Sequence, residues 1–317
     1  SLAYSAIGPD GVGRLWIRPM DSAAGRQLAN TEGAQFPFWS PDGRHLAFFA
    51  DGELRRVPEA GGSPRSLAKV EDPRGGTWSD QGQIVFVPDF RTGLSRVSAE
   101  GGDVQVLTEP DFEGGEKSHR WPVFLEGGDQ LVFLVQTGEG TSTDDRSTIE
   151  LFDLASGQRS VLMRENSSIA LARDQLIYWS NGDLHARRFD RSRGQVESGS
   201  RLVAQGVGYT VNEMAISAAG GSVLVYAGGS GLESRSQLAW WSREGEGLEL
   251  AAPLDVYRDA RLSHDGKKVA FYRGNTIWVR ELARGVSTRL SFEDGDHQGP
   301  FFSADDRTVF YTTTRGG

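Results

Sequence analysis

Cysteine does not occur among the 317 residues, so the fold can contain neither a disulfide framework nor thiolate metal ligands. No stretch approaches the roughly 18 consecutive apolar residues of a membrane-spanning helix, and we expect no membrane insertion by this segment. An excess of positive charge is missing as well, because 34 Lys and Arg face 43 Asp and Glu and the formal net charge is −9. Duplex binding depends on neutralising phosphates with clustered basic side chains, so we expect no nucleic-acid partner.

Catalytic signatures are lacking too. There is no Gly-x-Ser-x-Gly elbow, and Gly228–Gly231 follows a strand without the lysine or the helix of a phosphate-binding loop. Five histidines are scattered without the i,i+4 spacing of metal ligands: His45, His119, His185, His264 and His297. Acidic pairs fit polar turns better than a calcium loop: Asp144-Asp145, Glu293-Asp294 and Asp305-Asp306. We therefore expect no catalytic residue, no metal site and no cofactor in this chain.

A short apolar stretch followed by a polar turn and a second apolar strand occurs seven times. The clearest copies are Phe36–Gly43, which continues into Leu46–Phe49, and Thr77–Gly82, which continues into Ile84–Val87. Proline presets φ, aspartate accepts from nearby backbone N–H groups and glycine tolerates positive φ, so Ser-Pro-Asp-Gly predicts a tight turn between two strands. The equivalents of Ser40 follow at steps of 39 to 47 residues: Ser79, Leu125, Ala172, Ser217, Ser263 and Ser303.

A third and a fourth strand follow each turn. Alternating residues predict third strands at Leu54–Val57, Leu94–Val97, Ile149–Phe152 and Ile277–Arg280. A glycine turn then leads into a short fourth strand that ends near Leu67, Leu107, Leu162 or Leu290. Four strands in about 40–45 residues form one blade of a β-propeller, whereas the helix-period segments of a helical solenoid are absent. We therefore predict an all-β fold, a β-propeller of four-stranded blades.

The two ends of the chain complement each other in this pattern. Leu2–Tyr4, Leu15–Arg18 and Gln27–Leu28 fit a second, a third and a fourth strand, and Pro300–Ser303 with Thr308–Tyr311 fits a first and a second. A last blade shared by the N- and C-terminal strands would close the ring without exposed edges. The count favours seven blades, with six or eight as alternatives. We predict a single propeller domain over the whole chain, residues 1–317, as a fragment of a longer protein.

Two segments depart from the repeat. Ser118–Pro122 occupies the entry to a first strand, which in a propeller is innermost and lines the channel, and it combines a hydrogen-bond donor, a fixed cation and an aromatic ring. We therefore predict that His119, Arg120 and Trp121 bind a ligand. The long loop around Thr141 to Arg146 is the second place where we expect function.

Other conspicuous side chains have a structural explanation. Trp39, Trp78 and Phe302 stand at the end of a first strand, where packing between blades explains them better than ligand stacking. Four arginines lie on and after a third strand, where a solvated blade edge explains them better than an anion site: Arg187, Arg188, Arg191 and Arg193.

The turn Trp39–Gly43, with Leu262–Gly266 as a looser copy, resembles the repeats of TolB-like and WD-like propellers. A closer likeness is carried by an ordered set of segments: Leu15–Asp21, Glu32–Ala34, Phe36–Asp42, Phe48–Gly52, Ser118–Pro122 and Leu238–Gly245. This set is similar to the propeller regions C-terminal to bacterial serine/threonine protein kinase domains. The resemblance implies a sensor or protein-interaction module. The Gly-rich loop, the His-Arg-Asp loop and the Asp-Phe-Gly site of a kinase do not occur in this chain.

Three functions stay open. The first is a non-catalytic scaffold whose channel mouth or rim binds a protein, a peptide or a small molecule such as a glycan. The second is the gating propeller of a prolyl-oligopeptidase-like peptidase, whose catalytic domain would follow Gly317. The third is a propeller glycosidase, whose carboxylates could come from different blades. We favour the first, because repeat surfaces readily serve as binding platforms. Linkage to a membrane-spanning kinase would imply a periplasmic or extracytoplasmic location, and otherwise the chain would be cytoplasmic.

Overall fold

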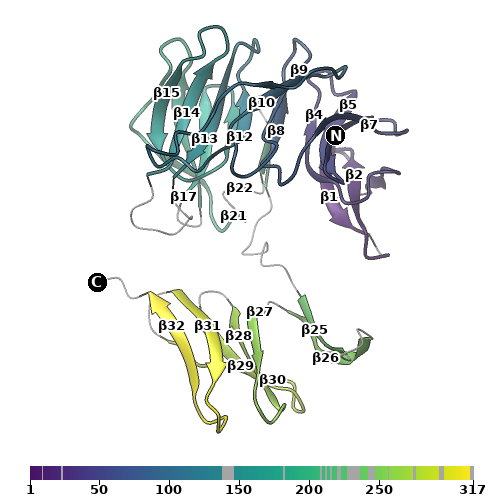
Figure 1. Cartoon of the computed structure of the whole chain (residues 1–317), viewed down its shortest axis with the longest axis vertical. Coiled ribbons are helices and arrows are strands. Elements are labelled where there is room, and N and C mark those ends of the chain that lie inside the picture. Colours follow the sequence, from purple (N-terminus) through teal and green to yellow (C-terminus); the bar gives the residue numbers. More distant parts are fainter. Residues whose placement is uncertain are drawn as a thin grey trace. The chain divides into compact units, whose positions relative to one another are not determined.

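The computed structural model describes residues 1–8, 10–22, 24–137, 146–180, 183–207, 209–210, 213–214, 216–219, 223–226, 236–241, 247–255, 257–273, 276–292 and 296–314. All regular elements in these residues are β-strands, paired antiparallel, which confirms the all-β prediction. The chain divides into two compact units, Ser1–Gly229 and Ser230–Gly317 (Figure 1). The predicted organisation of residues 1–317 as one domain stays a prediction.

In the first unit, consecutive strands pair within one sheet and then the next sheet begins. The first sheet has three described strands: β1 (Leu2–Ile7), β2 (Gly13–Arg18) and β3 (Arg26–Gln27). The second has four: β4 (Gln35–Trp39), β5 (His45–Ala50), β6 (Glu53–Pro58) and β7 (Arg65–Lys69). The third has four: β8 (Gly76–Trp78), β9 (Gln83–Phe86), β10 (Ser95–Ser98) and β11 (Gln105–Val106).

The fourth sheet contains β12 (Ser118–Phe124), β13 (Gln130–Gln136), β14 (Thr148–Asp153) and β15 (Arg159–Arg164). The fifth contains β16 (Ile169–Ala172), β17 (Gln175–Ser180), β18 (Asp183–Asp190) and β19 (Gln195–Val196), and β20 (Arg201–Ala204) pairs with β18 as well. Two hairpins end the unit: β21 (Tyr209–Thr210) with β22 (Glu213–Met214), and β23 (Ile216–Ala219) with β24 (Val223–Tyr226). Ser217 pairs with Val225 inside this last hairpin, so its turn comes later than the repeat predicts.

The second unit repeats the pattern. Its complete sheet contains β27 (Arg258–Leu262), β28 (Lys268–Arg273), β29 (Thr276–Glu281) and β30 (Val286–Arg289). Two hairpins flank it in sequence: β25 (Ser236–Trp241) with β26 (Gly247–Asp255), and β31 (Asp296–Phe302) with β32 (Val309–Thr314). The strands predicted at both chain ends are therefore present. The predicted sharing of a blade and the blade count stay predictions.

The turn after the first strand is held by a serine and an aspartate. Ser40 Oγ donates to Asp42 Oδ1 at 2.6 Å and accepts from the N–H of His45 at 2.9 Å, while Gly43 takes φ 69°. Ser263 with Asp265 and Ser303 with Asp305 repeat the first contact at 2.8 and 2.6 Å. These side chains replace missing backbone partners in the turn, which confirms that the Ser-Pro-Asp-Gly motif is structural.

The first strands of neighbouring sheets in the first unit contact one another, β4 with β8, β8 with β12, and β12 with β16. Most first strands carry an irregularity near their start, with one residue at positive φ: Phe36, Gly75, Trp121, Asp259 and Gly299. In β4, β12, β27 and β31 this residue falls within a register shift, as expected for a β-bulge. The bulge re-aims the side chains at the entry to the strand.

Apolar side chains fill the layers between sheets. Phe49, Phe86 and their neighbours form one such layer between the second and third sheets, with Trp78 packed against it. Trp39 packs against the layer between the first two sheets, and Phe302 in the second unit is buried. These positions confirm that the three aromatic residues belong to the core.

Candidate ligand-binding site

The predicted residues His119, Arg120 and Trp121 lie together near the start of β12, and all three are buried. His119 and Arg120 pair with Val135 and Leu134 of β13, so their side chains point to opposite faces of the sheet. Trp121 takes φ 53° at the bulge, so its side chain leaves the regular alternation. The three side chains therefore have different surroundings.

His119 faces the third sheet. Its Nδ1 lies 2.7 Å from Thr108 Oγ1, and its Nε2 lies 3.0 Å from both Glu116 Oε2 and Arg159 Nη1. The ring packs edge-on against Phe133 with centroids 5.1 Å apart. Burial lowers the pKa of His119, and Glu116 opposes this only in part. Because both ring nitrogens have partners and no part of the side chain is exposed, His119 cannot reach a substrate as an acid or base.

Two carboxylates complete the cluster around His119. Arg159, at the start of β15, pairs with Glu116 and, through Nε at 3.1 Å, with Glu150 of β14. Burial raises the pKa of Glu150, and the charge of Arg159 opposes the change. Burial would raise the pKa of Glu116 as well, but hydrogen bonds from Arg159, from the N–H of Asp111 and from His119 outweigh it and lower that pKa to about 2.

Two other sheets have an aromatic ring at the position equivalent to His119, and these rings pack in the same way. His297 meets Tyr311 edge-on at 5.3 Å, and Tyr257 meets Phe271 edge-on at 4.9 Å. In each case the ring precedes the positive-φ residue of a first strand by two and contacts the second strand. This repetition gives His119 a place in the framework of the fold.

Trp121 joins three successive first strands. Its backbone N–H donates to the carbonyl of Arg74 at 3.0 Å, just before β8, and its ring meets Phe36 of β4 edge-on at 5.2 Å. Arg120, on the other face of β12, donates through Nε to Ser118 Oγ at 2.7 Å. Both side chains shape the entry to the first strands, and neither exposes more than 7% of its surface.

The loops at this end of the first unit carry exposed groups. Within each sheet the loop from second to third strand and the connection to the next sheet lie at this end, because successive strands are antiparallel. We call this end of the unit the entry face, made by residues 71–75, 88–93 and 109–117. Two guanidinium groups lie over the ring of Phe90, that of Arg91 at 4.7 Å and that of Arg74 at 5.5 Å. Phe112 exposes 64% of its surface.

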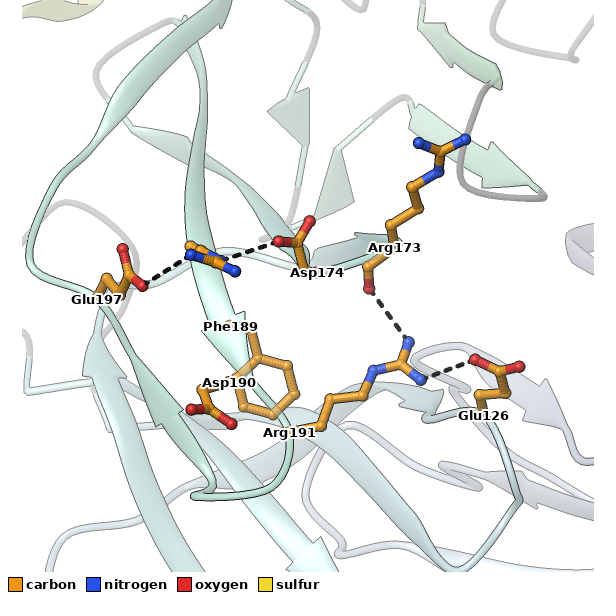
Figure 2. Close-up of a pocket in the computed structure, with 8 residues that line it drawn as sticks. Glu126, Arg173, Asp174, Phe189, Asp190, Arg191 and Glu197 are labelled. Carbon is orange, nitrogen blue, oxygen red and sulfur yellow. Dashed lines mark hydrogen bonds and ion pairs between the residues drawn. The ribbon is translucent and has the colours of Figure 1, made fainter.

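A separate pocket of about 580 Å³ lies among the turns of the fourth and fifth sheets (Figure 2). Arg188 pairs with Asp174 and Glu197, and Arg191 pairs with Glu126 and donates to the carbonyl of Arg173. The remaining lining residues are Phe189 and Asp190. Arg188 and Arg191 are already paired, and four carboxylates outnumber three arginines in the lining, so the pocket does not favour an anion.

The arginines around β18 and the loop around Thr141 to Arg146 were the other positions considered in the sequence. Arg193 pairs with Asp190, and Arg187 lies over the ring of Tyr178 at 5.6 Å, so the arginines of this region have local partners as expected for a solvated edge. Residues 141–145 of the second predicted segment lie outside the described residues. Among the described residues no three His, Cys, Asp or Glu side chains gather as a metal site.

No protein-family model matches the sequence, and no curated protein matches it. Solved structures do match the fold. A putative TolB from Agrobacterium tumefaciens is 16% identical, with a TM-score of 0.50 over 71% of this chain and 90% of that one. A chain of a nidogen/laminin complex is 10% identical, with a TM-score of 0.50 over 87% of this chain and 88% of the other.

The fold is a β-propeller. The four-stranded antiparallel sheets and the likeness to TolB agree on this, and identities at this level concern the fold alone. No helix in the described part of the propeller is long and apolar enough to cross a membrane. Sequence reasoning missed Glu116 and Arg159 as partners of His119, and Glu150 as the second partner of Arg159. Their separations of 3 to 40 residues follow no motif, and the only available signal was an acidic residue shortly before the histidine.

Proposed function

We propose that this propeller is a non-catalytic binding scaffold that engages a protein, peptide or small-molecule ligand at its entry face. The observation that carries the proposal is the exposed Phe112 on a turn that is itself tightly bonded. The N–H of Gly114 donates to Asp111 Oδ1 at 2.9 Å, and the N–H of Asp111 donates to Glu116 Oε2 at 2.8 Å. A large aromatic side chain held out on an ordered turn suits an interface, because aromatic side chains are the anchors that a partner buries.

The remainder of the entry face supports binding. Arg91 stacks on Phe90 beside it, and aromatic and arginine side chains are the types enriched at interfaces. Arg120 and Trp121 would act below this surface, by holding the entries of the first strands in place. A catalytic role finds less support, because His119 is enclosed and the turn serines Ser40 and Ser303 are bonded to aspartates.

The wider assignment rests on the sequence resemblance. We propose that the chain is the sensor module of a bacterial signalling kinase, and that it lies outside the cytoplasm where that kinase spans a membrane. The gating propeller of a peptidase and the propeller glycosidase are the competing assignments. A full-length reading frame with a kinase domain before residue 1 would support the first, and a hydrolase domain after residue 317 would support the second.

The binding proposal is tested by probing the chain on peptide and glycan arrays, with chromogenic esterase, peptidase and glycosidase substrates in parallel. We expect array binding that Phe112→Ala weakens at least tenfold. Met20→Ala, which also removes an exposed apolar side chain but in the turn between β2 and β3, should leave it unchanged. Substrate turnover without array binding would overturn the proposal, and so would equal binding by the two variants.

A further inference from the structure

We propose that the cluster of His119, Glu116, Glu150 and Arg159 is a pH-sensitive clamp on the turn Asp111–Glu116, which it releases when His119 takes up a second proton. The clamp lies between the third and fourth sheets, and the turn belongs to the connection between them. The inference goes beyond the proposed binding function, because the clamp can be tested without any ligand.

The contacts of Nε2 carry the argument. Arg159 can donate to this atom only when it has no proton, whereas the atom can donate to Glu116 only when it has one. With the proton on Nε2, a neutral ring donates to Glu116, and Nδ1 accepts from the Thr108 hydroxyl. Both ring nitrogens then have a hydrogen-bond partner. The one unfavourable contact is that between Nε2–H and Arg159 Nη1, because both atoms are donors.

A second proton disrupts this arrangement. Nδ1–H must then donate to Thr108 Oγ1, which also accepts from the N–H of Leu94 at 2.9 Å, so the hydroxyl proton has to turn away from the ring. The new imidazolium, itself fully buried, also stands 3.0 Å from a nitrogen of the half-buried Arg159 guanidinium. Two cations at this distance repel more strongly in such a partly buried site than they would in bulk water.

The clamp reaches the turn through one carboxylate. Glu116 accepts from Arg159 and from the N–H of Asp111, and it contacts His119, so the same two oxygens bind the cluster and close the turn. The imidazolium attracts Glu116 and repels Arg159. The N–H of Asp111, Arg159 and His119 then compete for the two oxygens of Glu116. The turn with Phe112 should therefore open more often.

The charges around His119 determine whether the clamp weakens or strengthens as the pH falls. Asp111, Glu116, Glu150 and Arg159 act within the cluster, and from the third sheet Arg96 faces the same layer but is held by Gln105. Because the folded pKa of His119 lies below 6.5, an opened state binds the proton first, and the clamp weakens as the pH falls below 6.5. Glu150 has a raised pKa and contributes in the opposite direction.

Hydrogen–deuterium exchange of the folded chain between pH 7.5 and 5.5 tests the clamp. After correction for intrinsic rates, we expect the protection of the Asp111, Gly114 and Glu116 amides to fall about fivefold, as a local opening does. The Gly266 amide, in a serine turn of the second unit, should keep its protection. In His119→Gln the protection should no longer fall as the pH is lowered, whereas the matched variant His264→Gln, at an exposed histidine paired with Asp306, should behave as wild type.

A second measurement needs no variant. An NMR titration of the His119 ring should give a pKa below 6.5, and the loss of amide protection should begin near pH 6.5 and level off below that pKa. A ring pKa at or above 6.5, or protection that is constant over this range in the wild-type chain, overturns the clamp. These outcomes are independent of the array experiment, so either proposal can fail alone.

Discussion

The indole ring of Trp121 lies against Gly75 so closely that a Cβ atom on Gly75 would come within 2.6 Å of the ring. The glycine precedes β8 and has φ 86°, a conformation that side chains rarely adopt. The close approach follows from the bulge in β12, which places the tryptophan over the neighbouring first strand, and the positive φ is the irregularity at the entry to β8 itself. The contact links the fourth sheet to the third at the entry face.

Gly75→Ala should therefore destabilise the protein by about 2–4 kcal/mol, from backbone strain together with the displaced ring. Gly43→Ala is the matched control, because Gly43 has φ 69° but no atom within 4 Å of its Cβ position. It should cost only the strain, about 1 kcal/mol. Urea unfolding followed by tryptophan fluorescence measures both, and equal losses in the two variants would contradict the packing argument.

Ser40→Ala should lower the free energy of unfolding by about 1 kcal/mol, because the N–H of His45 loses its acceptor in the turn. Ser156→Ala removes an exposed turn serine and should have a much smaller effect. The measurement is again urea unfolding. An effect of Ser40→Ala no larger than that of Ser156→Ala would mean that water replaces the serine hydroxyl.

Glu116→Gln should lower stability at pH 7 by about 1–2 kcal/mol, because Arg159 and His119 lose a charged partner in a largely buried site. The pKa of Glu116 is lowered from 4.5 to about 2 in the folded chain. Its contribution is therefore fully present above pH 4.5 and is lost as the pH falls toward 2.

The difference in stability between wild type and Glu116→Gln should accordingly shrink between pH 5 and about pH 2. Thermal unfolding over this range measures it. Glu59→Gln, at an exposed ion pair with Arg26, is the control and should show little difference at any pH. A difference in stability between wild type and Glu116→Gln that stays constant down to pH 2 would show that Glu116 is not ionically coupled to Arg159.

Arg173→Gly should raise stability by about 0.5–1 kcal/mol, because Arg173 has φ 55° in the turn between β16 and β17 and a glycine takes this conformation without strain. Arg44→Gly removes an exposed arginine from another turn without relieving a positive φ, and it should be neutral or slightly destabilising. Differential scanning calorimetry distinguishes the two. A loss of stability in Arg173→Gly would show that the arginine side chain contributes more than its strained backbone costs.

The strand pattern could be predicted because it depends on residues that are close together in the sequence. Alternation along Leu54–Val57 and the turn chemistry of Ser40, Asp42 and Gly43 act within a few residues, so they were visible in the sequence and recur in the structure. The fifth copy, around Ser217, was placed two residues early because it has no Ser-Pro-Asp-Gly to mark the turn.

The surroundings of the predicted site could not be predicted in this way. His119, Arg120 and Trp121 are adjacent in sequence, yet the pleat sends the first two to opposite faces and the bulge re-aims the third. Burial of all three depends on side chains from three other strands and two connections. Contacts of this kind have no fixed spacing along the chain.

The sequence by itself determined that this protein is built of repeated four-stranded β units, since hydrophobic alternation and turn residues act locally and need no distant partner. Only the tertiary structure decided that His119 contacts Glu116 and Arg159 in a buried layer, that Trp121 reaches across β8 to Phe36, and that Phe112 stands exposed. These relationships arise where one sheet packs on the next, and that packing brings together residues that are up to 85 positions apart.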